Sequence, residues 1–211
     1  MNEFNGILTL AVFMPIAASI LIALFMTGKI ARGFAIIATL AELVITSYIF
    51  IAYRNNPDGY QMVDRISEWI PIDSFRAEYF LGVDGLSAPL VLLTGILGLV
   101  AVFASWNVTE RTKEHFMWLL ALQGAVIGVF TALDFFLFFL FWELELIPMF
   151  FLISIWGTGR KEYSAMKFLI FTILGSAFML IGILALYFST GTFDMTILPD
   201  KIAGADLIIP A

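Results

Sequence analysis

The chain has 211 residues, of which 61% are hydrophobic and only 13% are charged, and its mean hydropathy is +0.98. A typical globular domain is about 45–50% apolar and about 25% charged, so these values exclude a water-soluble enzyme and a disordered chain. The net charge of −6 argues against binding to nucleic acid, and the absence of Cys together with a single His excludes disulfides, iron–sulfur clusters and multi-histidine metal sites in this chain. The composition therefore predicts a polytopic membrane protein.

Six apolar stretches are long enough to cross a bilayer as helices. A hydrocarbon core about 30 Å thick needs about 20 residues at about 1.5 Å each. Helices satisfy their own backbone groups in lipid, and the stretches lack the strict alternation of barrel strands. We therefore expect an all-α transmembrane bundle that forms a single membrane domain over residues 1–211, with spans at about 6–26, 31–53, 85–106, 116–133, 135–156 and 164–188.

The remaining segments are more polar. The first span is expected to be retained rather than cleaved, because residues 1–5 carry no basic residue and the apolar run is too long for a signal peptide. Residues 54–84 contain three Arg and six Asp or Glu, and we expect an extramembrane loop in which 62–72 form a short strand or a surface helix. Residues 189–211 are expected to form a mixed tail.

The distribution of Lys and Arg predicts the orientation, because cytoplasmic loops of membrane proteins are enriched in both residues. One side of the predicted bundle carries seven of them, Lys29, Arg32, Arg111, Lys113, Arg160, Lys161 and Lys167. The other side carries four, Arg54, Arg65, Arg76 and Lys201. We therefore expect both ends of this chain to lie outside the cytoplasm.

Glu143 is the most informative charged residue inside a predicted span. A charge at the bilayer centre costs about 2.5–3.5 kcal/mol on insertion scales, and such residues are functional by default. By helical rise, Glu143 lies roughly 12 Å from one end of its span and roughly 20 Å from the other, beyond the reach of its short side chain. A carboxyl that holds or releases a proton at this depth suits a proton relay. The alternative is a buried carboxyl that ties helices together by hydrogen bonding.

Three further charged residues lie inside predicted spans. Glu145 lies about 200° around the helix from Glu143, so it has either a separate function or a contact with a neighbouring helix or subunit. Glu42 is equally deep and is a candidate for a second relay or an inter-subunit contact. Lys167 lies about one turn inside the last span, which fits a side chain that reaches the cytoplasmic surface. On straight antiparallel helices it would be more than about 10 Å from Glu143 along the axis, so water would have to connect them.

Small residues predict close packing between the helices. Gly124 and Gly128 have the GxxxG spacing that lets membrane helices approach one another, although this spacing alone is a weak signal. His115, at the start of the fourth span, is interpreted as an interface residue rather than a relay.

An ordered set of motifs resembles a known family. The motifs are LGVDGLS at 81–87, LDFFLFFLFWELELIPMFFLISIWG at 133–157, a basic turn at 159–161 and AMKF at 165–168. Together they resemble the antiporter-like subunit M of proton-pumping NADH:quinone oxidoreductase, respiratory complex I, which is called chain 4 in organelles and has a counterpart in the photosynthetic version of the complex. The resemblance covers about residues 5–190. The IPMFFL continuation favours complex I over the cation/proton antiporters and membrane-bound hydrogenases of the same wider family.

This resemblance implies a proton-translocating membrane subunit without a redox centre of its own. The Glu that follows Trp matches Glu143, which the family uses for proton translocation, and the Lys before Phe matches Lys167, on the family's proton path. NADH, flavin, iron–sulfur clusters and quinone would bind to partner subunits, and no metal or cofactor to this chain. The implied partners are the other membrane and peripheral subunits of the complex, lipid and protons. The implied location is a bacterial-type plasma membrane or an equivalent energy-coupling membrane.

The resemblance also implies an incomplete antiporter-like fold. Family members have roughly fourteen helices built from two inverted repeats, and the family's essential residues on the seventh and eighth helices have no counterpart in these six spans. We therefore expect the chain to be unable to pump protons alone. Two other functions stay open. One is a subunit of a multisubunit cation/proton antiporter or membrane-bound hydrogenase, and the other is a structural membrane scaffold in which the buried charges are assembly contacts.

Overall fold

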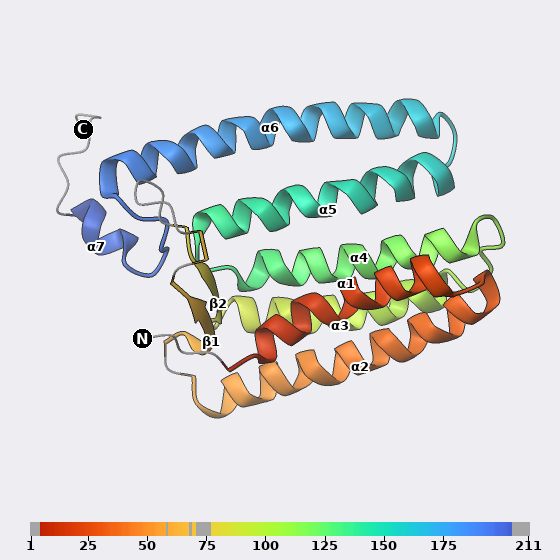
Figure 1. The fold of residues 1–211 in the computed structure, drawn as a ribbon, viewed down its shortest axis with the longest axis horizontal. Coiled ribbons are helices and arrows are strands. Elements are labelled where there is room, and N and C mark those ends of the chain that lie inside the picture. Colours follow the sequence, from red (N-terminus) through yellow and green to blue (C-terminus); the bar gives the residue numbers. More distant parts are fainter. Residues whose placement is uncertain (1–4, 58, 68, 71–76, 204–211) are drawn as a thin grey trace.

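In the computed structural model, each of six long helices runs antiparallel to the long helix before it, and a hairpin and a short seventh helix lie at one end of the bundle (Figure 1). The structure describes residues 5–57, 59–67, 69–70 and 77–203. The elements in chain order are α1 (Ile7–Phe25), α2 (Gly28–Asn55), β1 (Gln61–Ile66), β2 (Tyr79–Val83), α3 (Ser87–Ala104), α4 (Thr112–Thr131), α5 (Phe135–Trp156), α6 (Lys161–Thr190) and α7 (Leu198–Ala203).

The predicted helical membrane fold is confirmed, because α1 to α6 are each long and apolar enough to cross a membrane. The fifth helix has the predicted bounds of 135–156. The fourth helix begins four residues before the predicted 116, because its charged first turn lowers the local hydropathy, and it ends two residues before the predicted 133. The second and sixth helices are longer than predicted, at 28–55 and 161–190, since their polar ends continue the helix beyond the apolar stretch.

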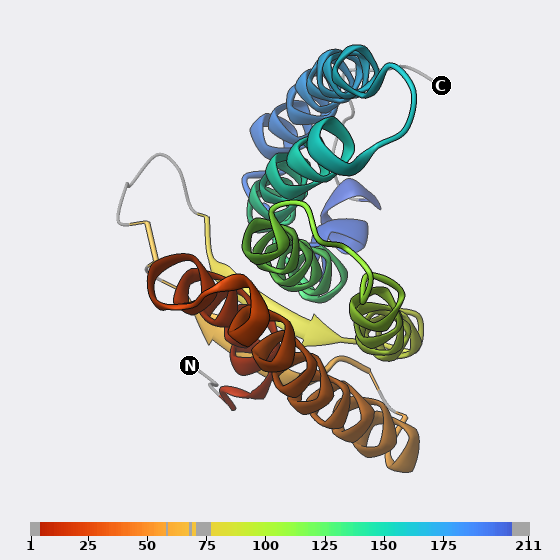
Figure 2. The ribbon, with the colours of Figure 1, turned by 90° about the vertical axis from the view of Figure 1, so that its right-hand side faces the viewer.

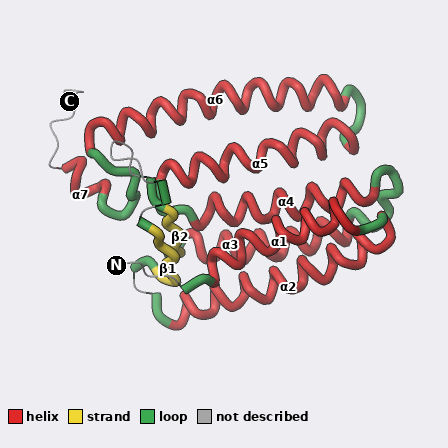
Figure 3. Tube along the Cα trace, in the orientation of Figure 1, coloured by secondary structure: helices red, strands yellow, loops and turns green. Residues whose placement is uncertain are grey.

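A two-stranded antiparallel sheet is the non-helical addition to this bundle (Figure 3). β1 falls in the segment for which a strand or surface helix was expected; residues 68 and 71–76 lie outside the described part of the chain. Arg65 pairs with Phe80 and Asp64 with Leu81, and a register shift separates Gln61 from Asp64. β2 is apolar, with the sequence YFLGV, and all five of its residues are buried against the helix ends.

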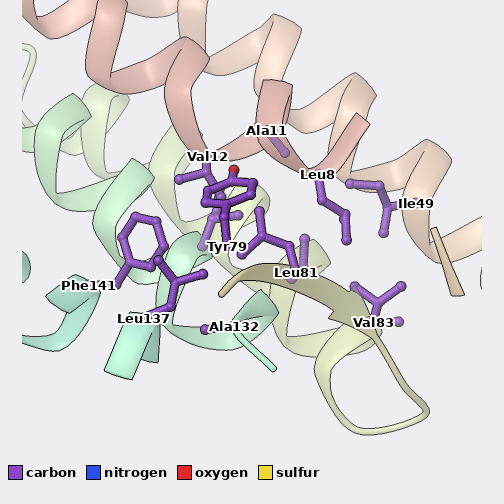
Figure 4. Packing of buried hydrophobic residues seen from close by; sticks show 13 residues of the cluster. Leu8, Ala11, Val12, Ile49, Tyr79, Leu81, Val83, Ala132, Leu137 and Phe141 are labelled. Carbon is purple, nitrogen blue, oxygen red and sulfur yellow. The ribbon is translucent and has the colours of Figure 1, made fainter. Parts of the chain in front are cut away.

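Helices α1 to α4 pack into one unit, the α1–α4 block, with two buried apolar clusters. The first cluster lies beside the hairpin, where β2 packs against α1, α2 and the α4–α5 junction (Figure 4). The second cluster lies toward the opposite end and joins all four helices through Ala18 and Ile22, Ala31, Ala35 and Ala38, Val102, Phe116 and Leu120. Each helix therefore buries a stripe of side chains at both ends of the block.

Glycines set the closest helix contacts, as the GxxxG spacing predicts. A Cβ atom on Gly124 would lie 2.7 Å from the Val12 carbonyl oxygen of α1, and one on Gly128 would lie 2.4 Å from the Phe141 ring of α5. The two glycines thus serve two different neighbours, with α4 between α1 and α5. Small residues permit this approach because they leave room for the facing backbone.

Helices α5 and α6 form a second unit, the α5–α6 pair, that extends from α4 away from α1 and α2 (Figure 2). α5 contacts α4 on one side and α6 on the other. α6 buries only Ala165, Ser176 and Ile183, and much of its apolar surface is exposed in this chain.

Candidate functional site

Glu143 lies in the middle of α5. Phe139, one turn earlier on the same face, packs into the same hydrophobic cluster as Met179 and Ile183 of α6. α6 is antiparallel to α5, and the residue one turn before Met179 is the buried Ser176. The Ser176 hydroxyl donates a 3.1 Å hydrogen bond to the Ile173 carbonyl oxygen of its own helix. From this helical spacing we infer that Glu143 lies at the α5–α6 contact, at about the level of Ser176.

The Glu143 carboxyl has an unmet hydrogen-bonding capacity. Its Oε1 atom is buried and has no hydrogen-bond partner among the described residues. The ion pairs of the described residues join Arg65 to Glu78 and Asp194, and Arg111 to Glu114, so Glu143 has no cationic partner there. A mid-helix carboxyl with a buried oxygen that no described residue satisfies is a candidate group for carrying a proton.

Lys167 lies on α6 but is not brought to Glu143. Its side chain is exposed, and its ammonium nitrogen lies 4.6 Å from the centre of the Tyr163 ring. Ser176 marks the level of Glu143, and Lys167 is roughly 13 Å from that level at 1.5 Å per residue. The structure agrees with the expectation that the two residues are separated along the helix axis. Whether they share a proton path remains a prediction.

The two other candidate carboxyls have different surroundings. Glu145 is half-buried on α5 and has no ion pair with a described residue. Glu42 is fully buried on α2, and neither of its carboxyl oxygens has a hydrogen-bond partner in the described part of the chain. Glu42 therefore lies inside the α1–α4 block, whereas Glu143 and Glu145 lie on the helix that joins the block to α6.

A cluster of charged side chains at the hairpin end was missed by sequence reasoning. Arg65 of β1 forms ion pairs with Glu78 at 2.6 Å and with Asp194 at 3.0 Å, and its guanidinium lies 4.4 Å from the centre of the Phe80 ring. These groups line a cavity of about 200 Å³ together with Asp134 and Lys201. We call Arg65, Glu78, Asp134, Asp194 and Lys201 the hairpin-end cluster. It links the hairpin to the start of α5 and to the segment between α6 and α7.

Asp134 is the N-terminal cap of α5. Its carboxylate accepts hydrogen bonds from the backbone N–H groups of Phe136 and Leu137, both at 2.9 Å, and from that of Glu78 at 3.2 Å. Burial raises the pKa of Asp134 to about 6, against the lowering effect of these three hydrogen bonds. An Asp directly before a long apolar run is the sequence signal that could have identified this cap.

Asp64 of β1 holds the start of α1 through hydrogen bonds to its backbone, as Asp134 does for α5. Its carboxylate is fully buried and accepts hydrogen bonds from the backbone N–H groups of Gly6 and Thr9 and from the Thr9 hydroxyl. Tyr79 of β2 shares a 2.9 Å hydrogen bond with the same hydroxyl, and burial raises the pKa of Tyr79. The hairpin therefore supplies the groups that hold the start of α1.

His115 is an interface residue, as expected. Its Nε2 atom lies 2.9 Å from the Ser105 hydroxyl, and its ring packs edge-on against Trp156 with 4.7 Å between the ring centres. Trp156 in turn donates to the Glu110 carbonyl oxygen at 2.9 Å. These contacts join the ends of α3, α4 and α5. Within the described ranges, no group of three or more His, Asp or Glu side chains is arranged to hold a metal ion.

Comparisons with known proteins bear on both the motifs and the fold. The family described as "NADH:quinone oxidoreductase/Mrp antiporter, TM" matches residues 132–206, a segment that contains Glu143 and Lys167. NAD(P)H-quinone oxidoreductase chain 4 1 of Synechococcus elongatus is 43% identical over 194 residues, which are 90% of this chain and 36% of that protein. The chain thus spans a little over a third of the length of the curated relatives it matches.

Solved structures with the same fold include chains of two membrane complexes. The structure matches a chain of respiratory complex I from Thermus thermophilus with bound NADH, with a TM-score of 0.79 and 22% identity, over 92% of this chain and 39% of that chain. It also matches a chain of the Mrp complex from Dietzia sp., with a TM-score of 0.74 and 20% identity, over 94% of this chain and 39% of that one. At these identities the likeness shows the fold alone.

Proposed function

We propose that this chain, which is related to the chain 4 subunits of NAD(P)H-quinone oxidoreductase, is part of a membrane subunit that translocates protons. Electron transfer from NADH to quinone takes place in other subunits, which hold the NADH, flavin, iron–sulfur clusters and quinone. The observation that carries this proposal is Glu143, a mid-helix carboxyl with a buried oxygen that has no partner among the described residues. It lies within the segment that matches the antiporter family.

Glu143 is the proton carrier in this proposal, and Lys167 lies on the path that serves it. The carboxyl is the group that exchanges the proton, and water provides the link to Lys167 across the intervening helix length. Exposure of the Lys167 ammonium on a membrane helix is costly unless another protein group or a lipid headgroup meets it. Partner membrane and peripheral subunits of the complex would meet this face.

The experiment that tests the role of Glu143 is the Glu143→Gln substitution in the full-length subunit within the intact complex. Gln has the same shape but cannot exchange a proton, so proton translocation into proteoliposomes should be abolished while the complex still assembles. Glu145→Gln, two residues along the same helix, is the matched control. Normal translocation by the Glu143 variant would overturn the proposal. If the variant reduces assembly of the complex but the assembled fraction still pumps protons, the result would support the scaffold hypothesis instead.

A cation/proton antiporter subunit is the second candidate, because the family match and the Mrp structure from Dietzia share this fold. The two candidates differ in their requirement for electron transfer. An antiporter moves protons in membranes without NADH and responds to added sodium. Proton movement that needs NADH and quinone, and that ignores sodium, supports the oxidoreductase.

The orientation of the chain is part of the proposal. α1 begins and α6 ends at the hairpin end, and most Lys and Arg residues lie at the other end, so the positive-inside rule places the hairpin end outside the cytoplasm. Because the chain has no Cys, single Cys substitutions can test this in intact cells. A membrane-impermeant maleimide should label exposed Asn56→Cys at the hairpin end but not exposed Thr158→Cys between α5 and α6. The reverse pattern would contradict the orientation.

A further inference from the structure

A polar layer crosses the α1–α4 block between its two apolar clusters. On α2, Ala38 belongs to one cluster and Ile49 to the other, and Glu42 lies between them. On α4, Leu120 and Ile127 belong to the two clusters, and Gln123 lies between them. The layer is at mid-height in helices that are long enough to span a membrane, where unpaired polar groups are most costly.

Close helix contacts place Glu42 and Gln123 at the same height. A Cβ atom on Gly95 of α3 would lie 2.2 Å from the Thr46 hydroxyl, and one on Gly98 would lie 2.4 Å from the Gln123 side chain. α2 and α3 are antiparallel. Moving back one turn on α2, from Thr46 to Glu42, therefore leads to the same height as moving forward about one turn on α3, from Gly95 to Gly98. Glu42, Gly98 and Gln123 therefore share one level of the block.

Both side chains have polar atoms that no described residue satisfies. Glu42 is 0% exposed with two partner-free carboxyl oxygens, and Gln123 is 5% exposed with a partner-free Nε2 atom. The Thr39 and Thr46 hydroxyls of α2 donate to backbone carbonyl oxygens of their own helix, so neither donates to the Glu42 carboxyl. Native proteins satisfy nearly all buried polar groups, so these atoms indicate a ligand in the layer.

No cation faces Glu42 from the helices around it. α1 and α3 carry no charged residue over their described lengths. The charged groups of α4 are confined to its first turn, at Lys113, Glu114 and His115. On α2, Lys29, Arg32 and Arg54 lie ten or more residues from Glu42, which is roughly 15 Å or more along the helix. An ionised carboxylate would be uncompensated here, so Glu42 carries its proton.

We propose that Glu42 and Gln123 form a buried proton-holding site, in which a protonated carboxyl and an amide are bridged by a bound water molecule. A protonated carboxyl offers one donor and an acceptor oxygen, and a primary amide offers two donors and an acceptor. A buried water typically makes about three hydrogen bonds and matches this set. The groove of about 360 Å³ between α3 and α4 also reaches Gln123, but apolar side chains make up most of its wall and supply no alternative partner.

This site does not depend on the proposed function of Glu143. It lies among the four helices of the α1–α4 block, whereas Glu143 is inferred to lie at the α5–α6 contact. The site holds its proton within the block, and it accounts for a carboxyl that the translocation path through α5 and α6 does not use.

Infrared difference spectroscopy of the intact complex in lipid nanodiscs tests the proposal. Subtracting the spectrum of a Glu42→Gln variant should reveal a band from the carbonyl stretch of a protonated carboxyl. Gln123→Leu should shift this band to higher frequency, because the bridging water loses the amide that holds it against the carboxyl, while the control Glu145→Gln should leave the band unmoved. The exchanged pair Glu42→Gln with Gln123→Glu covers the case in which a single variant fails to fold, and it should restore a protonated-carboxyl band.

Each opposite result would overturn the proposal. Carboxylate bands in place of the protonated-carboxyl band would show that Glu42 is ionised. An unmoved band in Gln123→Leu would show that the amide does not interact with Glu42. A map of the intact complex that resolves ordered water should show density between the two side chains, and an empty gap or a direct carboxyl–amide contact would remove the water from the site.

Discussion

The α1–α4 block and the α5–α6 pair each contain a mid-helix Glu with a buried carboxyl oxygen that no described residue satisfies, but they enclose it differently. Glu42 in the block is covered completely, between two apolar clusters and beside glycines that bring α2, α3 and α4 together. Glu143 in the pair lies on a helix with one neighbour on each side, next to an α6 that buries only three residues. Both residues lie near the middle of a long apolar helix, whereas their enclosure by other helices differs.

This difference separates holding a proton from exchanging one. A carboxyl closed in on every side keeps the protonation state that its surroundings favour. A carboxyl at an open helix contact can meet water or a group from another segment, which is the requirement for translocation. The comparison predicts that substitutions in the block mainly affect stability, and that substitutions in the pair mainly affect function.

The junction between the two regions should show the largest effect on stability, through Asp134. Burial raises the pKa of Asp134 from 3.8 to about 6, so between these values the folded protein keeps a proton that the unfolded chain has released. Stability should therefore fall as pH rises through this window, by about 3 kcal/mol at about 1.4 kcal/mol per pKa unit, and stay constant above it. Asp134→Asn, which keeps a capping side chain, should lose this dependence.

The measurement is the thermal unfolding midpoint of both proteins in detergent from about pH 4 to pH 7, taken as the difference between wild type and variant. Parallel curves across this range would show that the Asp134 carboxyl does not hold an extra proton in the folded state.

Matched glycine substitutions compare the interior of the block directly with the pair. Gly124→Ala should destabilise the protein by about 2 kcal/mol, because the new methyl group would lie 2.7 Å from the Val12 carbonyl oxygen. The backbone of α1 would have to shift to relieve this contact. Gly175→Ala on α6 has no atom within 4 Å of its new methyl group and should be neutral or slightly stabilising. Denaturation in mixed micelles measures both, and equal losses would contradict the difference in packing.

A smaller effect is expected at Arg65, which ties the hairpin to the segment after α6. Arg65→Met keeps much of the apolar stem but leaves the buried Asp194 without its cation, at a cost of about 1 kcal/mol. Hydrogen exchange should increase at residues 191–197, whereas the control Arg54→Met, on an exposed residue at the end of α2, should leave these amides unchanged. Unchanged exchange in the Arg65 variant would show that the ion pair does not hold this segment.

Sequence reasoning predicted the helices well where apolar length and capping residues agree. α5 has the predicted bounds because Asp134 caps its start, and Gly157 follows its last residue directly after the apolar run. The depth of Glu143 followed from its position in that run. α4 began earlier than predicted because its first turn carries Lys113 and Glu114, which continue the helix but lower its hydropathy.

The hairpin-end cluster and the polar layer could not be predicted in the same way. Arg65 and Asp194 are 129 positions apart, and their ion pair exists only because the hairpin and the end of α6 meet at one end of the bundle. Glu42 was visible as an anomaly in an apolar span, but Gln123 is unremarkable in sequence. Its significance comes from the contact with Gly98, a matter of how the helices are packed.

The number of protons translocated per electron in the intact complex, measured for Glu143→Gln and Glu42→Gln side by side, tests the central claim most directly. The account predicts that Glu143→Gln abolishes proton translocation by the assembled complex, while Glu42→Gln leaves the ratio unchanged in the complexes that assemble. A normal ratio with Glu143→Gln, or a loss confined to Glu42→Gln, would contradict the assignment of proton exchange to the α5–α6 pair.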